Sequence, residues 1–209
     1  MAQFSELQMR AALEVGEKQA SVGSIVNLRG GRQGEVITSN LHGKYTEQVL
    51  NGNVFSVANQ AAVTTTAAMA TTWTGLGVAN PITSGYNLAL IGFGCSQFAV
   101  GAAGSIGIIG CTSSGFASAI TIQNAKLGSR ASVALADDGA TIVSPVLLRT
   151  FGSVGSLATT GYGLMPGIWA ELDGSIVITP GMAVASYTTI VTTTALIFTF
   201  VWEEIPINS

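Results

Sequence analysis

Charged residues are scarce in this chain of 209 residues, where they make up only 9%. About 25% is typical of soluble domains, which scatter charges over their surface to keep apolar patches small. Ten of the nineteen charged side chains precede residue 48, and none lies between Gln48 and Ala125. So little charge indicates that partner subunits cover much of the surface, with a membrane as the alternative cover.

An excess of positive charge is also missing. The net charge is −3, and the first 47 residues balance five basic against five acidic side chains. A protein that binds a genome directly needs clusters of Lys and Arg to neutralise phosphates. We therefore expect no direct contact with nucleic acid.

Residue types that carry catalysis or bind metals are few. His42 is the only histidine, and Cys95 and Cys111 are the only cysteines. A Ser-His-Asp or Cys-His arrangement would have to use His42, and a structural zinc site needs further ligands. Glu203 and Glu204 are adjacent in a strand pattern, which places them on opposite faces. The sequence predicts no catalytic residue, no cofactor and no metal. It favours two buried thiols over a disulfide, which would require neighbouring strands to bring the cysteines together.

The polar start of the chain shows no signal-peptide pattern. The strongest candidate for a membrane span is Leu88–Gly110, which is uncharged but contains six glycines. Each glycine costs a helix about 1 kcal/mol, so two β-strands are the better interpretation. We expect no membrane contact.

The N-terminal region, residues 1–50, is expected to be an arm with a short helix over about 5–16 and an extended segment after it. Ser5 and Gln8 form a capping box, and Gly16 is a suitable stop. Apolar residues lie on both sides of this helix, so both sides need cover, and they are candidate interface residues: Phe4, Leu7, Met9 and Leu13. A disordered leader is the alternative.

From residue 51 to 209 the sequence has a β texture. Short runs of Val, Ile, Thr, Phe and Tyr alternate with Gly, Asn, Pro and Ser at a spacing near ten residues, which is typical of a sandwich or barrel. Turn signals are Asp137-Asp138-Gly139, Asp173-Gly174 and Pro180-Gly181. The predicted strands are 61–67, 86–94, 96–100, 105–110, 116–122, 131–136, 141–149, 167–171, 174–179, 182–189 and 194–203.

The last of these strands has two apolar faces. Leu196, Phe198, Phe200 and Trp202 share one face, which we expect in the core. The opposite face is also mostly apolar, so it is expected to meet another sheet, the arm or another subunit: Ile197, Thr199 and Val201. The uncharged threonine-rich run 64–74 likewise suits a permanent protein interface. Trp73, Trp169 and Trp202 leave a sugar-stacking platform open as an alternative use.

Several short motifs occur in an order that resembles virion-associated structural proteins of tailed bacteriophages, over roughly residues 50–206. They are Gly52-Asn53-Val54-Phe55, Ala58-Asn59-Gln60, Thr74-Gly75-Leu76, Asn80-Pro81, Leu147-Leu148-Arg149, Leu172-Asp173-Gly174-Ser175-Ile176-Val177 with Pro180-Gly181, and the closing Val201-Trp202-Glu203-Glu204-Ile205-Pro206. The resemblance implies a jelly-roll-like β-domain. It also implies a particle component that assembles as a ring or trimer on the capsid, without catalytic residues.

These observations predict an all-β protein, a jelly-roll-like β-sandwich over residues 51–209 preceded by the arm. Its expected role is that of a non-enzymatic cement or decoration protein on the capsid surface. It would be a homotrimer that contacts the major capsid protein. Alternatives are a fibre or tail protein that binds a receptor or glycan, and the capsid shell protein itself. A β-sandwich enzyme is disfavoured because ionisable groups are few and scattered.

Overall fold

The structure, a computed structural model, describes residues 43–97, 103–154, 167–192 and 196–207. The chain divides into two compact units, Met1–Lys44 and Tyr45–Ser209. The second unit holds every element described below, including the short helix α1 (Thr46–Leu50), which precedes the expected domain start at residue 51. The expected helix over 5–16 and the residues Phe4, Leu7, Met9 and Leu13 lie outside the described residues.

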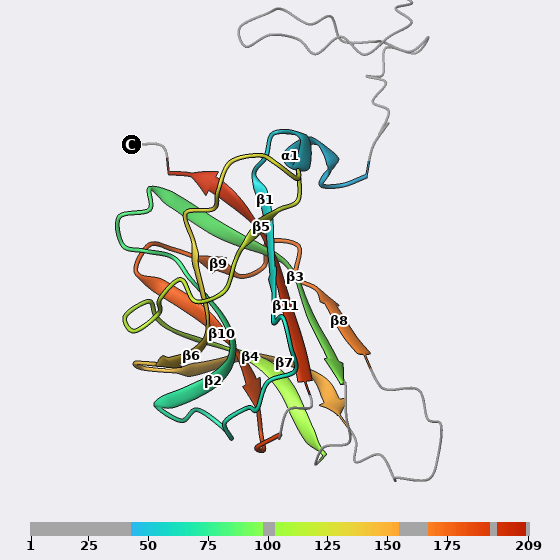
Figure 1. Cartoon of the computed structure of the whole chain (residues 1–209), viewed down its shortest axis with the longest axis vertical. Helices are drawn as coiled ribbons and strands as arrows, with labels where there is room; N and C mark the ends of the chain where they lie inside the picture. Colours follow the sequence, from blue (N-terminus) through green and yellow to red (C-terminus); the bar gives the residue numbers. More distant parts are fainter. Residues whose placement is uncertain (1–42, 98–102, 155–166, 193–195, 208–209) are drawn as a thin grey trace, which may run out of the picture. The chain divides into compact units, whose positions relative to one another are not determined.

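The second unit is a sandwich of two antiparallel sheets (Figure 1). Sheet I has the order β5-β1-β11-β3-β8, with β9 also paired to β3. Its strands are β5 (Gln123–Asn124), β1 (Val54–Ala58), β11 (Leu196–Pro206), β3 (Tyr86–Gln97), β8 (Gly167–Glu171) and β9 (Val177–Ile178). Sheet II has the order β6-β2-β10-β4-β7. Its strands are β6 (Leu135–Thr141), β2 (Thr72–Ala79), β10 (Met182–Thr188), β4 (Gly104–Thr112) and β7 (Val146–Val154).

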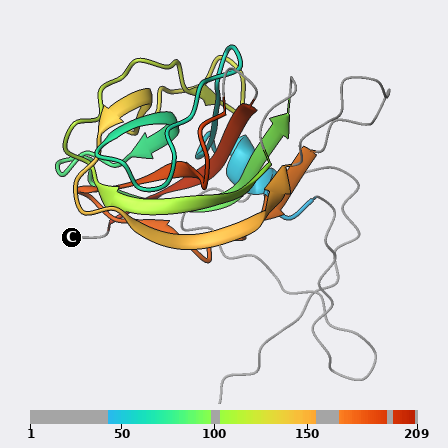
Figure 2. The same ribbon diagram turned by 90° about the horizontal axis from the view of Figure 1, so that it is seen from below.

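The strand pairing is that of a jelly roll. When the short strands β5 and β9 and the edge strand β6 are set aside, the first main strand pairs with the last, β1 with β11, and the second with the second-last, β2 with β10. The third and fourth follow the same rule, β3 with β8 and β4 with β7. This is one long antiparallel ribbon rolled into two sheets, so the sequence-based prediction of an all-β, jelly-roll-like sandwich is confirmed. Seen from below, the curved strands β4 and β7 run side by side (Figure 2).

The last strand places its aromatic face in the core as predicted. Phe198, Phe200 and Trp202 are fully buried, and they alternate with half-buried residues along β11. The ring of Phe93 in β3 lies 5.1 Å from that of Phe200 and 6.1 Å from that of Phe198. Leu88–Gly110 contains most of two strands, β3 and β4, which agrees with the sequence interpretation. Within the described part of the chain, no helix is long and apolar enough to cross a membrane.

Two predicted strands are wrong, because side-chain hydrogen bonds hold those segments as loops, and a third, 131–136, is a strand only from Leu135. Segment 61–67 makes one isolated bridge, Val63 to Leu196, and 116–122 is not a strand. In the first segment, the buried hydroxyl of Thr65 contacts those of Thr192 (2.8 Å) and Thr188 (2.9 Å). The threonines here therefore bond within the chain instead of forming a flat outer surface.

The predicted turn at Asp137-Asp138-Gly139 is also wrong, since these residues lie within β6. Asp137 is buried, and its carboxylate accepts hydrogen bonds from the backbone N–H groups of Ala117 (2.9 Å) and Gly139 (3.1 Å). It therefore anchors the loop that follows β4. The Pro180-Gly181 turn is present, with Gly181 at φ +88°, and it passes from β9 in sheet I to β10 in sheet II.

Candidate interaction face

The outer face of sheet II is covered by the chain itself. Trp73 is 2% exposed, and its indole N–H donates to the carbonyl of Ser186 (2.9 Å). Phe116, from the loop after β4, lies over Gly77, where a Cβ would be 2.4 Å from the Phe116 ring. The Trp73 and Phe116 rings are 6.2 Å apart, and Ile142 joins the same buried cluster. This face is therefore a second small core, separate from the one between the sheets.

The outer face of sheet I carries an exposed tryptophan that packs over two glycines. Trp169 of β8 is 56% exposed. A Cβ at Gly92 would lie 2.5 Å from its ring, and one at Gly94 would lie 3.2 Å from it. The indole thus lies flat against the β3 backbone, because these two positions have no side chain. Its other side is open within the described residues.

The three predicted interface residues of the last strand lie on this same face. Ile197, Thr199 and Val201 are half-buried and alternate with core residues along β11. A Cβ at Gly94 would lie 3.5 Å from the Cβ of Thr199, which places the two side by side. We call this surface the Trp169 face, and it comprises Gly92, Gly94, Trp169, Ile197, Thr199 and Val201.

Acidic groups lie only at the border of the Trp169 face, as far as the described residues show. Glu171 pairs with Gly92 across the strands, and Glu203 follows Val201 on the outward side of β11. Burial raises the pKa of the Glu203 carboxyl, because its neighbours remove water from the charged form. A partner that covers the centre of this face would bury no charged side chain there.

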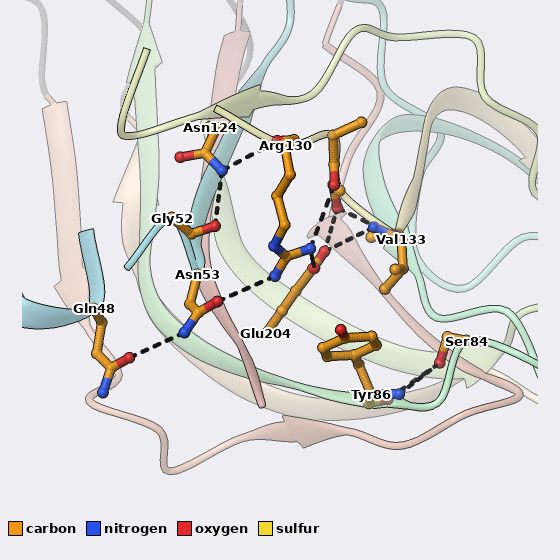
Figure 3. A network of polar contacts seen from close by, with 12 residues as sticks. Gln48, Gly52, Asn53, Ser84, Tyr86, Asn124, Arg130, Val133 and Glu204 are labelled. Atoms are coloured by element: carbon orange, nitrogen blue, oxygen red, sulfur yellow. Dashed lines mark hydrogen bonds and ion pairs between the residues drawn. The ribbon is translucent and has the colours of Figure 1, made fainter. Parts of the chain in front are cut away.

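Glu204 lies on the opposite face of β11 from Glu203, as predicted, and it is buried in a polar network (Figure 3). Its carboxylate accepts hydrogen bonds from the guanidinium of Arg130 (2.6 Å), the hydroxyl of Ser132 (2.5 Å) and the backbone N–H of Val133 (2.9 Å). With both carboxylate oxygens engaged, Glu204 is placed to hold the 130–133 segment against sheet I.

Arg130 extends this network toward α1. Its guanidinium lies over the rings of Phe55 (4.8 Å) and Tyr86 (5.4 Å), and it donates to Asn53 Oδ1 at 3.4 Å. Asn53 in turn donates to Gln48 of the helix (Figure 3). These contacts join the helix, the first strand and the 124–133 loop. The network holds these segments together around the Glu204 side chain, which is fully buried.

The two cysteines are free and buried in different clusters. Cys95 belongs to the core between the sheets and Cys111 to the cluster on the outside of sheet II. Burial raises the pKa of Cys95 to about 12 and that of Cys111 to about 11, so both are thiols at neutral pH. The prediction of two buried thiols rather than a disulfide is confirmed. His42 lies outside the described residues, and within them no group of three His, Cys, Asp or Glu could hold a metal ion.

The sequence did not single out Trp169 as the exposed tryptophan, although Gly92-Phe93-Gly94 carried a signal. Glycines at alternate positions of a strand mark a close approach on one face, and here the approaching group is the indole. Trp73 and Trp202 are buried in separate clusters, so the three tryptophans form no common platform. Comparison with protein-family models, curated proteins and solved structures finds no match to this chain.

Proposed function

We propose that this protein is a non-enzymatic structural component of a bacteriophage particle, a cement or decoration protein on the capsid surface. Three copies would pack around a threefold axis through the Trp169 face, and the trimer would bind the major capsid protein. The single observation that carries the proposal is an aromatic side chain held 56% exposed on an almost uncharged sheet face. The order of the short motifs that resemble phage structural proteins also supports a role in a phage particle.

The physical basis is burial of apolar surface without desolvation of charge. Removing apolar area from water stabilises a contact by about 25 cal/mol per Å², and tryptophan is among the residues that dominate such contacts. Charges at the centre of an interface oppose association unless they are paired. The Trp169 face places its acidic groups at the border, which suits a permanent contact. The arm residues Phe4, Leu7, Met9 and Leu13 would add a second contact, with a neighbouring subunit or the shell.

Native mass spectrometry of the full chain and of Trp169→Ala tests the oligomer. We expect a species of three times 21.3 kDa at micromolar concentration, and at least a tenfold weaker association for the variant. The matched control is Ile82→Ala, which removes a 79% exposed side chain from the loop between β2 and β3, beside Gly181. A wild-type monomer at this concentration contradicts the proposal.

The station on the particle is tested by electron microscopy and mass spectrometry of purified particles. Threefold knobs at capsomer junctions that contain this chain would support the cement role. Deleting residues 1–20 should then lower capsid occupancy while the β-domain stays folded. A location at the tail tip instead would favour the second candidate, a receptor- or glycan-binding protein.

The second candidate has one observation of its own. The open side of the Trp169 indole, with the exposed carboxylate of Glu171 nearby in β8, suits a sugar ring that stacks and donates hydroxyl hydrogen bonds. A glycan array with Trp169→Ala as the control separates the two functions. Binding of specific glycans that is lost in the variant would favour the receptor-binding role.

A further inference from the structure

A groove of about 430 Å³ lies between β7 of sheet II and residues 175–179, which include β9 of sheet I. The start of β10 and Gly110 of β4 also line it. Leu148, Val177 and Met182 line the groove and remain 46%, 49% and 42% exposed. The groove is therefore apolar, open to solvent and bordered by two strands of the sandwich.

The strand β7 on one side of this groove has a free edge. Seven of its nine residues pair with β4, in a register that shifts at Leu148 and at Phe151. Its opposite edge makes no backbone hydrogen bond to any described residue. Val146 and Leu147 on this strand are 61% and 40% exposed. A long apolar edge with unpaired N–H and C=O groups is a template for a further strand, and folded proteins usually protect such edges.

Arg149 is the one charged residue among the described residues that line the groove. Its guanidinium donates to the hydroxyl of Ser175 at 3.2 Å, and it has no carboxylate partner in the described part of the chain. Guanidinium groups bind carboxylates with paired hydrogen bonds, more strongly than they bind a neutral hydroxyl. The edge of the groove is therefore complementary to an acidic residue.

We propose that the groove binds one extended segment of a partner protein, which adds to β7 as a further strand. In an extended segment, alternate side chains point the same way and are about 6.7 Å apart. Two apolar side chains at such positions would fill the groove beside Leu148 and Val177, and an acidic side chain near them would bind Arg149. Backbone hydrogen bonds to β7 supply affinity, while the groove and Arg149 supply selectivity. This site is separate from the Trp169 face and does not depend on the proposed function.

The test uses the full chain and a labelled, end-blocked peptide, Thr-Val-Thr-Val-Thr-Glu, in which the two valines and the glutamate point to the same side of an extended strand. Binding is followed by fluorescence anisotropy. We expect binding at least tenfold tighter than that of the same peptide with Lys in place of Glu. Arg149→Glu should reverse this preference, and methylation of alternate peptide N–H groups should abolish binding because it removes strand pairing. Val177→Lys should weaken binding at least tenfold. Both residues are exposed, and unchanged melting temperatures would show that the variants fold.

Equal binding of the acidic and basic peptides, or no reversal by Arg149→Glu, would overturn the assignment. Two other occupants are distinguished by the same materials. Residues 33–40 of this chain also carry an acidic residue beside apolar ones, Glu35 with Val36 and Ile37. If a peptide of these residues displaces the probe at a lower concentration than the unlabelled probe does, the groove is assigned to this chain's own segment. Loss of self-association in Arg149→Glu would assign it to a second copy. Either result would overturn the partner-protein proposal, whereas Trp169→Ala should leave peptide binding unchanged.

Discussion

Each outer face of the sandwich has an aromatic ring packed on glycine, but the ring is buried on one face and exposed on the other. On each sheet an aromatic ring lies on glycine, Phe116 on Gly77 in sheet II and Trp169 on Gly92 and Gly94 in sheet I. Phe116 is 8% exposed because Trp73 lies beside it and its loop covers the face, whereas Trp169 is 56% exposed. The chain thus builds its own cover for one face. On the other it presents an aromatic ring that no described residue covers.

The largest effect is expected from Trp73→Ala on the covered face. This substitution removes a buried indole and its hydrogen bond to Ser186, and Trp→Ala changes in cores cost about 3–5 kcal/mol. Urea denaturation at neutral pH, with the full chain, measures the free energy of unfolding. The matched variant is Trp169→Ala, for which we expect a smaller cost, because this indole is already 56% exposed in the folded protein. Similar costs for the two variants would show that both faces are core.

Gly92→Ala is expected to act on association more than on folding. The added Cβ would lie 2.5 Å from the Trp169 ring, so the indole must leave its position flat on β3. We expect roughly tenfold weaker self-association, equivalent to about 1.4 kcal/mol, measured by sedimentation equilibrium. Gly167→Ala is the control in β8, since a Cβ there has no atom within 4 Å. Unchanged association in Gly92→Ala would mean that the position of the Trp169 indole on β3 does not affect the contact between subunits.

Most strands of the two sheets could be predicted because their signals are local, whereas β1 and β2 were not among the predicted strands. Strict alternation along Leu196–Trp202 identifies a strand with one core face, and the spacing of turn residues identifies a sandwich. The wrong strand predictions in the loops also have a local cause. Thr and Ala runs such as 61–67 favour strands by propensity, but the Thr65 hydroxyl offers the backbone near Thr192 an alternative hydrogen bond.

The difference between the two faces could not be predicted, because it depends on contacts far apart in sequence. Trp169 reaches its glycines only through the pairing of β8 with β3, about 75 residues earlier in the chain. Trp73 is buried in a cluster that includes Phe116, whose loop is anchored by Asp137. The residues next to each tryptophan in the sequence do not distinguish the buried one from the exposed one.

The smallest effect is expected from Glu203→Gln at the border of the Trp169 face. Burial raises the pKa of this carboxyl above its ordinary value of 4.5, so the folded protein gives up the proton at higher pH than the unfolded chain does. The contribution of this carboxyl to stability is therefore fully present below pH 4.5, and it declines as the pH rises through the folded-state pKa. Gln resembles the protonated acid, so the variant should lack this decline and be slightly more stable than wild type at pH 7.

Thermal melting of both proteins between pH 4 and pH 7 measures the difference, with Glu171→Gln as the control on the exposed side of the same border. If the Trp169 face is covered in an oligomer, the difference should grow with protein concentration, because a partner removes more water from Glu203. A difference independent of concentration would place Glu203 outside the contact.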